Sequence, residues 1–355
     1  MKRILVIQNK RIGDVLISSI IANNIKSVFP DCEVDYFVYD YTSAVLLHNP
    51  NIDRIIQTND KELKKITKLV STINAIKSSS YDIIFDPYAK LQSRLMCLFS
   101  GAKYRIGLKR AHKSLKLPFY THEVDFLPQT SKICGKAIED RIHLIESVFP
   151  LEDVDYTPKI FLTAAEKQYA KLDDISYPVI MYGILGSTAQ KSMPFDYTAN
   201  LIDFVLSNYN VKILFNYAPH QKKEALEVYK LCKHKDDIIF DLYEENLRDF
   251  ISLMNKCDAL IANEGGIVHI AKALHKPTYT IFSPYVNKEF WASFEDGEFH
   301  ISSHLLEEKP ELFNEFTFEA RKKIEANPYQ LYRELTPDLI LKKMRLFLDT
   351  HLTKP

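Results

Sequence analysis

Residues 258–284 constrain the fold more than any other stretch of this 355-residue chain. They open with an apolar run of the length of a buried strand, which the adjacent glycines Gly265 and Gly266 follow. Apolar residues then recur at helical spacing up to Lys276, and Pro277 ends this helix before a second β-rich run. Strand, tight turn, helix and strand in this order predict a βαβ unit.

The turn in this unit predicts a place where an anion can bind. Two glycines allow a sharp turn and leave the start of the helix without side chains. The free N–H groups at a helix N-terminus bind negatively charged groups such as a diphosphate. An ordinary βαβ corner with a Gly-Gly turn is the alternative interpretation.

Strands and helices alternate along the rest of the chain in two series. The first begins with a strand at residues 2–8 and the second with a strand at residues 179–185, and the connection lies near residues 155–177. Such alternation predicts parallel sheets with helices on both faces, and a chain of this length is expected to form two domains. We expect domains at residues 1–165 and 166–335. We expect a final helix at residues 336–355. This helix packs back on the N-terminal domain in one of the arrangements that we consider.

Composition narrows the functional classes. Lysine plus arginine and aspartate plus glutamate both total 46, so the net charge is zero and binding to nucleic acid is not expected. The five cysteines form no CxxC pair, which is typical of a reduced, cytoplasmic protein. No apolar run approaches the roughly 20 residues that a membrane span needs.

Polar residues follow several of the predicted strands. In parallel sheets ligands bind beyond the carboxyl ends of the strands, and residues 9–14 and 86–94 occupy such positions. Asp14 is a candidate general base there, although a carboxylate at that point can also serve as a helix cap. The first strand is not followed by GxGxxG, which argues against a dinucleotide-binding dehydrogenase.

Residues 103–116 form a local basic segment without any acidic residue. Its positive charge predicts contact with an anionic acceptor or with membrane phosphates. A solvated loop is the alternative.

Three separated blocks resemble the family 9 glycosyltransferases, the ADP-heptose:lipopolysaccharide heptosyltransferases. They are KRILVIQNKRIGDVLISS, YDIIFDPYAKLQSRLMCLFSGAKYRIG and NEGGIVHIAKALHKPTYTIFSP. The resemblance implies the GT-B fold, with two Rossmann-like domains and a cleft between them. The N-terminal domain would bind the acceptor and the C-terminal domain the nucleotide-sugar donor. It also implies inversion at the sugar without a metal or other cofactor, and we interpret the one Asp-x-Asp, Asp153-Val154-Asp155, as chance.

The resemblance also implies roles for individual residues. Asp14 matches the family's proposed base, and Lys191 matches the lysine that binds the donor phosphates. His269 either binds near the diphosphate or packs. The donor-binding set is Ser187, Thr188, Gln221, Glu264, Gly265, Gly266 and His269, and the acceptor-binding set is Lys10, Arg11, Arg94, Arg105 and Lys109.

Several positions depart from the family pattern. Glu264 stands where aspartate is usual, Gln221 lies near the position of a ribose-binding carboxylate, and Ser283 replaces the glycine of Phe-Gly-Pro. The aromatic residue expected after Lys191 is absent. These departures leave the donor sugar and its nucleotide open.

The leading hypothesis is an inverting glycosyltransferase that moves heptose from an ADP-activated donor to a hydroxyl of a lipopolysaccharide core or similar bacterial glycan. We expect it in the cytoplasm, with peripheral contact to the inner membrane. A GT-B enzyme with a UDP or GDP donor, an epimerase of the same fold, and a non-catalytic glycan-binding relative are the alternatives.

Overall fold

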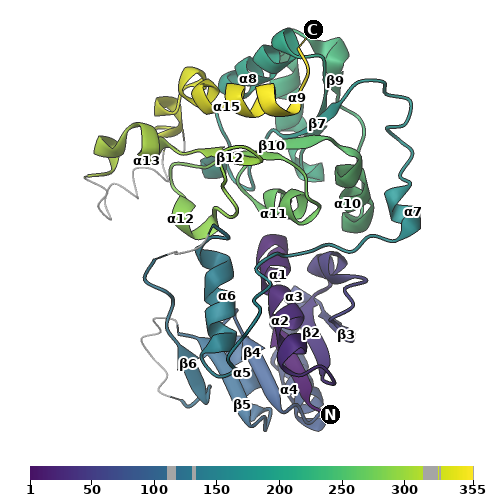
Figure 1. Ribbon diagram of the computed structural model, residues 1–355, viewed down its shortest axis with the longest axis vertical. Coiled ribbons are helices and arrows are strands. Elements are labelled where there is room, and N and C mark those ends of the chain that lie inside the picture. The colour runs from purple at the N-terminus through teal and green to yellow at the C-terminus, as the bar shows by residue number, and fades with distance from the viewer. Residues whose placement is uncertain (110–116, 130–132, 315–326, 328, 355) are drawn as a thin grey trace. The chain divides into compact units, whose positions relative to one another are not determined.

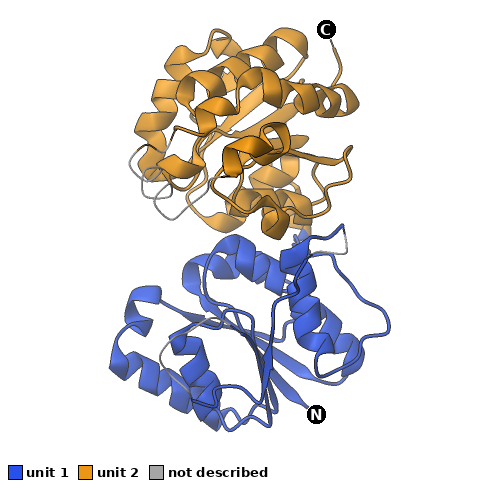
Figure 2. Cartoon of the chain, turned by 90° about the vertical axis from the view of Figure 1, so that its left-hand side faces the viewer, with its two compact units in different colours: residues 1–163 blue, residues 164–355 orange. Residues whose placement is uncertain are grey.

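The structure is a computed structural model, which describes residues 1–355 except 110–116, 130–132, 315–326, 328 and 355 (Figure 1). The chain divides into two compact units, Met1–Thr163 and Ala164–Pro355, which are coloured separately in Figure 2. Within the described residues, each unit contains one sheet of six strands, and every strand pairing is parallel. The predicted α/β class is therefore confirmed.

The first unit has the strand order of a dinucleotide-binding fold. Its strands are β1 (Arg3–Ile7), β2 (Glu33–Tyr39), β3 (Arg54–Thr58), β4 (Ile83–Asp86), β5 (Tyr104–Leu108) and β6 (His122–Val124). The order β3-β2-β1-β4-β5-β6 reverses between β1 and β4, and Leu5 of β1 pairs with both Asp35 and Ile84. Buried aliphatic residues fill β1 and β4, as expected for a sheet that is covered on both faces.

Helices cover both faces of this sheet. On one face lie α1 (Ile12–Ser18), α2 (Ile20–Val28) and α6 (Lys136–Glu146); on the other lie α4 (Ile66–Ser78) and α5 (Leu91–Phe99). The short element η1 (Asp40–Leu46) contacts α1, and the short helix α3 (Asp60–Leu63) contacts α4. Helix α4 packs through Leu69, Ile73 and Ile76 against a core that includes Leu5 and Met96.

Three features of this unit differ from the expectation. The helix expected from Asp14 begins at Ile12, and a second helix starts at Ile20. The segment from residue 103 is not simply a loop, because its first part forms strand β5. Strand β6 and helix α6 had not been predicted, since both border stretches of charged and polar residues that weaken the periodic signal.

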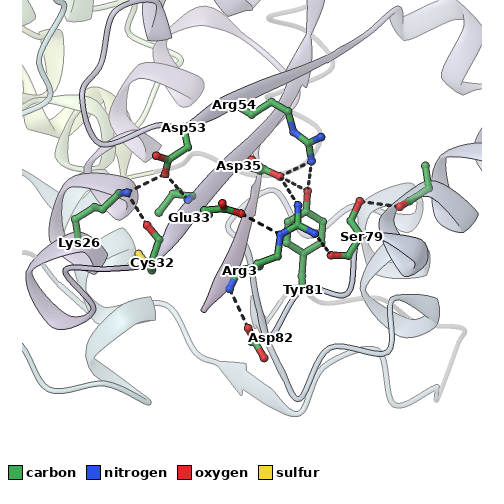
Figure 3. A network of polar contacts seen from close by, with 12 residues as sticks. Arg3, Lys26, Cys32, Glu33, Asp35, Asp53, Arg54, Ser79, Tyr81 and Asp82 are labelled. Carbon is green, nitrogen blue, oxygen red and sulfur yellow. Dashed lines mark hydrogen bonds and ion pairs between the residues drawn. The ribbon is translucent and has the colours of Figure 1, made fainter. Parts of the chain in front are cut away.

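A network of charged and polar side chains connects the amino-terminal ends of β3, β2, β1 and β4 (Figure 3). The Asp35 carboxylate is buried, lies 2.5 Å from Arg54 Nη2 and accepts a hydrogen bond from the Tyr81 hydroxyl. Arg3 donates from Nε to Glu33 and from its backbone N–H to Asp82. Burial, together with the Asp35 carboxylate, raises the pKa of Tyr81 to about 12. The network lies at the edge of the sheet opposite to that where ligands bind.

The second unit repeats the same strand order. Its strands are β7 (Val179–Gly183), β8 (Lys212–Asn216), β9 (Ile238–Ile239), β10 (Ala259–Asn263), β11 (Thr278–Ile281) and β12 (His300–Ser303). The order β12-β11-β10-β7-β8-β9 is the first sheet's order read from the opposite edge, with its reversal between β7 and β10. The βαβ unit predicted at residues 258–284 is confirmed as β10, α11 (Gly266–Ala273) and β11.

The remaining helices pack on this second sheet. The longer ones are α8 (Phe195–Asn208), α9 (Lys222–Leu231), α10 (Leu247–Lys256) and α15 (Pro337–His351); the short ones include α7 (Ala164–Lys167), α12 (Lys288–Trp291), α13 (Leu305–Glu308), η2 (Ala189–Lys191), η3 (Pro219–Gln221) and η6 (Tyr332–Glu334). Asn246 caps α10 as expected, because its side chain accepts from Asp249 N.

The closing helix α15 belongs to the second unit. Its buried residues Ile340, Met344 and Phe347 join the core formed by α8, β11 and β12, and Tyr279 donates a hydrogen bond to Ile340 O. Packing of this helix on the N-terminal domain was one arrangement that we considered. In the structure, the apolar face of α15 packs instead in the core of the second unit. In the described part of the chain, no helix is both long and apolar enough to cross a membrane.

Candidate donor and base sites

Each sheet has one point where its strand order reverses. Ligands of open α/β sheets bind outside the carboxyl ends of the strands at such a point. In the first unit, β1 and β4 meet there, and the segment after β1 carries Asp14. In the second unit, β7 and β10 meet there, and the segments that follow them carry Lys191 and Glu264. The sequence motifs therefore lie at the positions where this fold binds ligands.

Lys191 and Glu264 form an ion pair in the second unit. Lys191 Nζ lies 2.8 Å from Glu264 Oε1 and 3.1 Å from Oε2. The Glu264 side chain is 8% exposed and that of Lys191 25% exposed, so the cation is the partner that solvent reaches. From the sequence, Lys191 was expected to bind the donor phosphates and Glu264 to bind the donor elsewhere. In the structure the two side chains contact each other directly before helix α11.

The N-terminus of α11 opens onto free space. Gly265 occupies the N-cap position with a φ of 161°, which is extended backbone that any residue adopts. A Cβ added at Gly265 would meet no heavy atom within 4 Å. The chain bends at Glu264 and Gly265, as the sequence predicted, and the glycine also leaves space before the helix start at Gly266. The first N–H groups of a helix lack intrahelical acceptors, and the helix dipole makes this end positive.

The loop that carries Lys191 folds tightly on itself. A Cβ on Gly186 would lie 2.1 Å from Lys191 O, so a side chain at this position would displace the lysine backbone. Gly186 N donates to Ser192 Oγ, whose hydroxyl in turn donates to Thr188 O, both at 2.9 Å. Ser187 and Thr188 are exposed on this loop, where their hydroxyls are accessible.

Two residues that depart from the family pattern donate hydrogen bonds to backbone carbonyls of this loop. Gln221 Nε2 donates to Gly186 O at 2.8 Å, and Ser283 Oγ donates to Gln190 O at 2.7 Å. The other end of the Gln221 amide accepts from Ala218 N at 3.1 Å. Gln221 therefore braces the loop, and its role in donor binding stays a prediction.

Two further residues of this site, Asn263 and Tyr332, were not predicted from the sequence. Asn263 Nδ2 donates to Gly183 O at 3.1 Å, and its Oδ1 accepts from Met193 N at 3.3 Å. The buried Tyr332 hydroxyl lies 3.4 Å from both Lys191 O and Asn263 Oδ1, and burial raises its pKa well above the usual range. Asn263 opens the Asn-Glu-Gly-Gly motif and could have been found from it. Tyr332 lies in an irregular segment that carries no such signal.

His269 lies in α11 and is half-buried. The centroid of its ring is 6.2 Å from that of Trp291, with the planes tilted by 56°. The packing role that we considered is therefore present, and a role at the diphosphate stays a prediction.

Asp14 is the third residue of α1 and not its cap. Arg11 occupies the N-cap position, without a side-chain capping bond. The Asp14 carboxylate forms an ion pair with Arg141 of α6, whose Nη2 lies 3.5 Å from Asp14 Oδ1. Arg141 is buried, and it donates from Nε to Ser18 Oγ and from Nη1 to Ala137 O. A buried cation beside a carboxylate favours the ionised form, which is the form that a general base requires.

The loop before α1 contains a strained residue. Arg11 has a φ of 58° and a ψ of 133°, a conformation that L-residues rarely adopt. Such strain persists where the surrounding structure enforces it, often at functional sites. Lys10 and Arg11 are both exposed on this loop at the start of α1.

The other three acceptor candidates lie in different surroundings. Arg94 of α5 stacks 4.2 Å from the Phe119 ring centroid, and its buried Nε has no hydrogen-bond partner among the described residues. Lys109 pairs with Asp125 at 3.1 Å. Arg105 lies near the amino end of β5 and donates to Phe119 O and Ala102 O, so its guanidinium is used within the fold. The rest of the basic segment, residues 110–116, lies outside the described residues.

Asp155 of the Asp-x-Asp pair is used within the first unit. Asp155 exchanges two hydrogen bonds with the Asn24 side chain through its own backbone and forms an ion pair with Lys159 at 2.7 Å. In the part of the chain that the structure describes, no group of three or more His, Cys, Asp or Glu side chains is placed to hold a metal ion.

Two Rossmann-like units in one chain, each with functional residues after the strands at its reversal point, define the GT-B class of fold. The sequence profile of glycosyltransferase family 9 (heptosyltransferase) matches residues 69–320. The chain therefore belongs to glycosyltransferase family 9.

Individual relatives agree with this assignment. Lipopolysaccharide heptosyltransferase 1 from Campylobacter coli is 22% identical over 79% of this chain and 83% of the relative. The glycosyltransferase family 9 structure from Veillonella parvula DSM 2008 superimposes with a TM-score of 0.76 at 17% identity, over 97% of this chain and 96% of the other. E. coli heptosyltransferase WaaC, solved with ADP-2-deoxy-2-fluoro heptose, gives a TM-score of 0.63 at 16% identity over 85% and 92%. The two structural likenesses concern the fold.

Proposed function

We propose that this chain transfers heptose from an ADP-activated donor to a hydroxyl of a lipopolysaccharide core or similar anionic glycan, with inversion and without a metal ion. The observation that carries the proposal is Lys191, held by Glu264 beside the open N-terminus of α11. The names of the relatives and the nucleotide-sugar bound to WaaC support heptose and ADP as the first candidates to test.

The second unit would bind the donor. Lys191 and the free N–H groups of α11 would contact the diphosphate, with Ser187 and Thr188 as further hydroxyl donors. As the bond between the anomeric carbon and the phosphate oxygen breaks, its electron pair leaves with the nucleotide, and negative charge grows on the diphosphate. A fixed cation and oriented backbone donors stabilise that charge. They supply the positive charge for which other transferases use a metal ion, so we expect turnover to continue in the presence of a chelator.

The first unit would supply the base. The acceptor hydroxyl loses its proton to the Asp14 carboxylate as its oxygen attacks the anomeric carbon opposite to the leaving diphosphate. Attack from that side inverts the configuration. The buried Arg141 beside Asp14 holds the carboxylate in place and favours its ionised form.

The acceptor would be held by cationic side chains of the first unit. Lys10 and Arg11 are exposed beside the start of the Asp14 helix, and Arg94 and Lys109 are further candidates. An anionic core glycan in a lipid would bring the protein to the inner membrane as a peripheral, cytoplasmic protein, with no role for nucleic acid.

A panel of ADP-, UDP- and GDP-activated sugars tests this proposal. Purified protein with a core glycan acceptor should release ADP from the ADP-activated heptose and little nucleotide from the others. Release of UDP or GDP would replace the donor that we propose, and no release from any sugar would indicate a binding protein. Asp14→Ala should bind ADP normally while losing transfer, and near-normal turnover in that variant would remove Asp14 as the base.

A further inference from the structure

One surface of the first unit plays no part in the mechanism above. At the carboxyl-terminal edge of the sheet, η1 follows β2, α3 and α4 follow β3, and α5 follows β4. Each of these connections exposes a large apolar side chain at or near the start of its helix: Tyr41 is 51%, Ile66 78% and Leu91 52% exposed. We call these three residues the apolar rim. Large apolar side chains gathered in one place on a surface mark a site of interaction.

Hydrogen bonds show that the connections carrying the rim lie side by side. Asn59, the N-cap of α3, donates to Asp40 at the start of η1 at 3.0 Å. Gln92, in the first turn of α5, donates to Leu63 O at the end of α3 at 2.9 Å. Helix α3 is therefore the common neighbour, and each rim residue is within three residues of one of these bonds in the sequence.

Lysines accompany the rim. They are Lys61, Lys64, Lys65, Lys68 and Lys90, and all are exposed. Lys64 and Lys65 pair with the acids of α3 at 3.3 and 3.6 Å. Within the described residues, Lys61, Lys68 and Lys90 have no acidic side chain in ion-pair distance, and no acidic residue occurs between Leu63 and Asp82. The rim thus combines exposed apolar groups with an excess of positive charge.

We propose that the apolar rim and its lysines are a docking surface for an anionic lipid bilayer. Apolar side chains that enter the headgroup region, flanked by lysines that meet lipid phosphates, are the chemistry of interfacial membrane binding. A water-soluble anionic glycan would account for the lysines and leave the exposed Ile66 and Leu91 unexplained. Residues 103–116, for which we considered an anionic acceptor or membrane phosphates, follow β4 in the chain, and a contact there stays a separate prediction.

The position of the rim relates membrane docking to the transfer reaction. This relation rests on the proposed function. Helix α1, which carries Asp14, begins at the same edge of the same sheet, because it follows β1. A bilayer bound at the rim therefore lies beside the edge at which the proposed base acts. A lipid-anchored acceptor would be delivered to Asp14 by movement in the membrane plane.

Sedimentation with vesicles tests the docking directly. The wild-type protein should pellet with vesicles of phosphatidylcholine and phosphatidylglycerol, and much less with phosphatidylcholine alone. Ile66→Ser with Leu91→Ser should remove most of this binding. Lys61→Gln with Lys68→Gln should weaken it roughly 25-fold, since each lysine near an anionic surface contributes about fivefold. The control is Leu226→Ser with Leu231→Ser, two leucines exposed on the lysine-bearing helix α9 of the second unit, which should pellet like the wild type.

Wild-type binding by the rim variants, or equal binding to both kinds of vesicle, would overturn the docking surface. So would binding that requires acceptor glycolipid in the vesicle, because the rim would then be an acceptor site. The same variants should transfer sugar to a water-soluble acceptor fragment at the wild-type rate. If the wild type transfers no sugar from any donor while the vesicle results hold, the proposed function fails and the docking surface stands.

Discussion

Lys191 Nζ lies 2.8 Å from Glu264 Oε1, so the proposed phosphate-binding cation already has a carboxylate partner before any donor arrives. Glu264 is nearly buried and holds the ammonium from the side of the protein, which leaves the exposed side of the lysine to a ligand. The longer side chain of glutamate, which differs from the family's aspartate, gives the reach for this pairing.

Removing one partner of this pair should destabilise the second unit. Lys191→Met leaves the Glu264 carboxylate buried without its cation, and we expect a loss of about 1–3 kcal/mol, since one partner remains partly exposed. Lys191→Met combined with Glu264→Gln should recover much of it. Thermal unfolding of the single and double variants measures the coupling. Additive losses would mean that the pair contributes no interaction energy.

Gly186→Ala and Gly265→Ala should differ in their effect on stability and agree in their effect on donor affinity. At Gly186 the new methyl group meets the Lys191 backbone, so both the unfolding temperature and ADP affinity should fall. At Gly265 the methyl group meets no protein atom within 4 Å, so stability should be unchanged. It would stand in the space before α11, and ADP affinity should fall at least tenfold. Unchanged ADP binding in Gly265→Ala would mean that the diphosphate lies elsewhere.

Ser283→Ala and Gln221→Ala should each raise the KM for the donor. Each removes a hydrogen bond that fixes the Lys191 loop, and one such bond contributes about 1 kcal/mol, or roughly fivefold. The KM for the acceptor should stay the same, which separates loop positioning from a general loss of structure. Ser207→Ala is the matched control. Ser207 is exposed on α8, and its hydroxyl contacts the His234 side chain. Donor KM values that do not move would show that the loop is held without these side chains.

Arg141 should matter for Asp14 through charge as well as packing. Asp14→Asn should lower kcat by about 10²–10⁴ without changing ADP affinity, the range typical of a lost general base. Arg141→Lys keeps a positive charge near Asp14 and should retain more activity than Arg141→Met. Steady-state kinetics with circular dichroism as a folding check measures both. Equal activity in the two Arg141 variants would limit that residue to packing.

Much of this architecture could be predicted from the sequence, and the reason lies in particular segments. The run before Gly265 and the strand at residues 2–8 are apolar and short with clear ends, so their strands and the motifs behind them were found. Helix α6 was missed, and Arg141 with it. Arg141 contacts Asp14, which lies 127 positions away in the sequence. No local sequence pattern indicates such a contact, because only the fold brings the two residues together.

Departures from a family pattern were also hard to interpret from the sequence. Gln221 and Ser283 left the donor sugar and its nucleotide open, because each departs from the family pattern at its position. In the structure both donate hydrogen bonds to the Lys191 loop, and they do so from segments after β8 and β11. Their common target could not be predicted, because it depends on how three loops meet at one edge of a sheet.

The second unit should lose stability in acid because of His300. Burial lowers the pKa of this histidine from 6.5 to about 3, and Thr278 contacts its Nδ1 at 2.9 Å. Below pH 6.5 the unfolded chain binds a proton that the folded chain does not, so stability falls as pH falls toward 3. At pH 4 the loss from this residue is of the order of 2–3 kcal/mol. His300→Gln should therefore unfold with a shallower dependence on pH between 6.5 and 4 than the wild type, and identical slopes would contradict a neutral His300.

The central claim is that Lys191 binds the diphosphate of the donor, and calorimetric titration with ADP and AMP tests it most directly. The two ligands differ by one phosphate, so the ratio of their affinities isolates the contact to that group. We predict that the wild type binds ADP at least tenfold more tightly than AMP, and that Lys191→Met removes most of this preference while binding AMP almost as well as the wild type. A preference for ADP that persists unchanged in Lys191→Met would contradict the account.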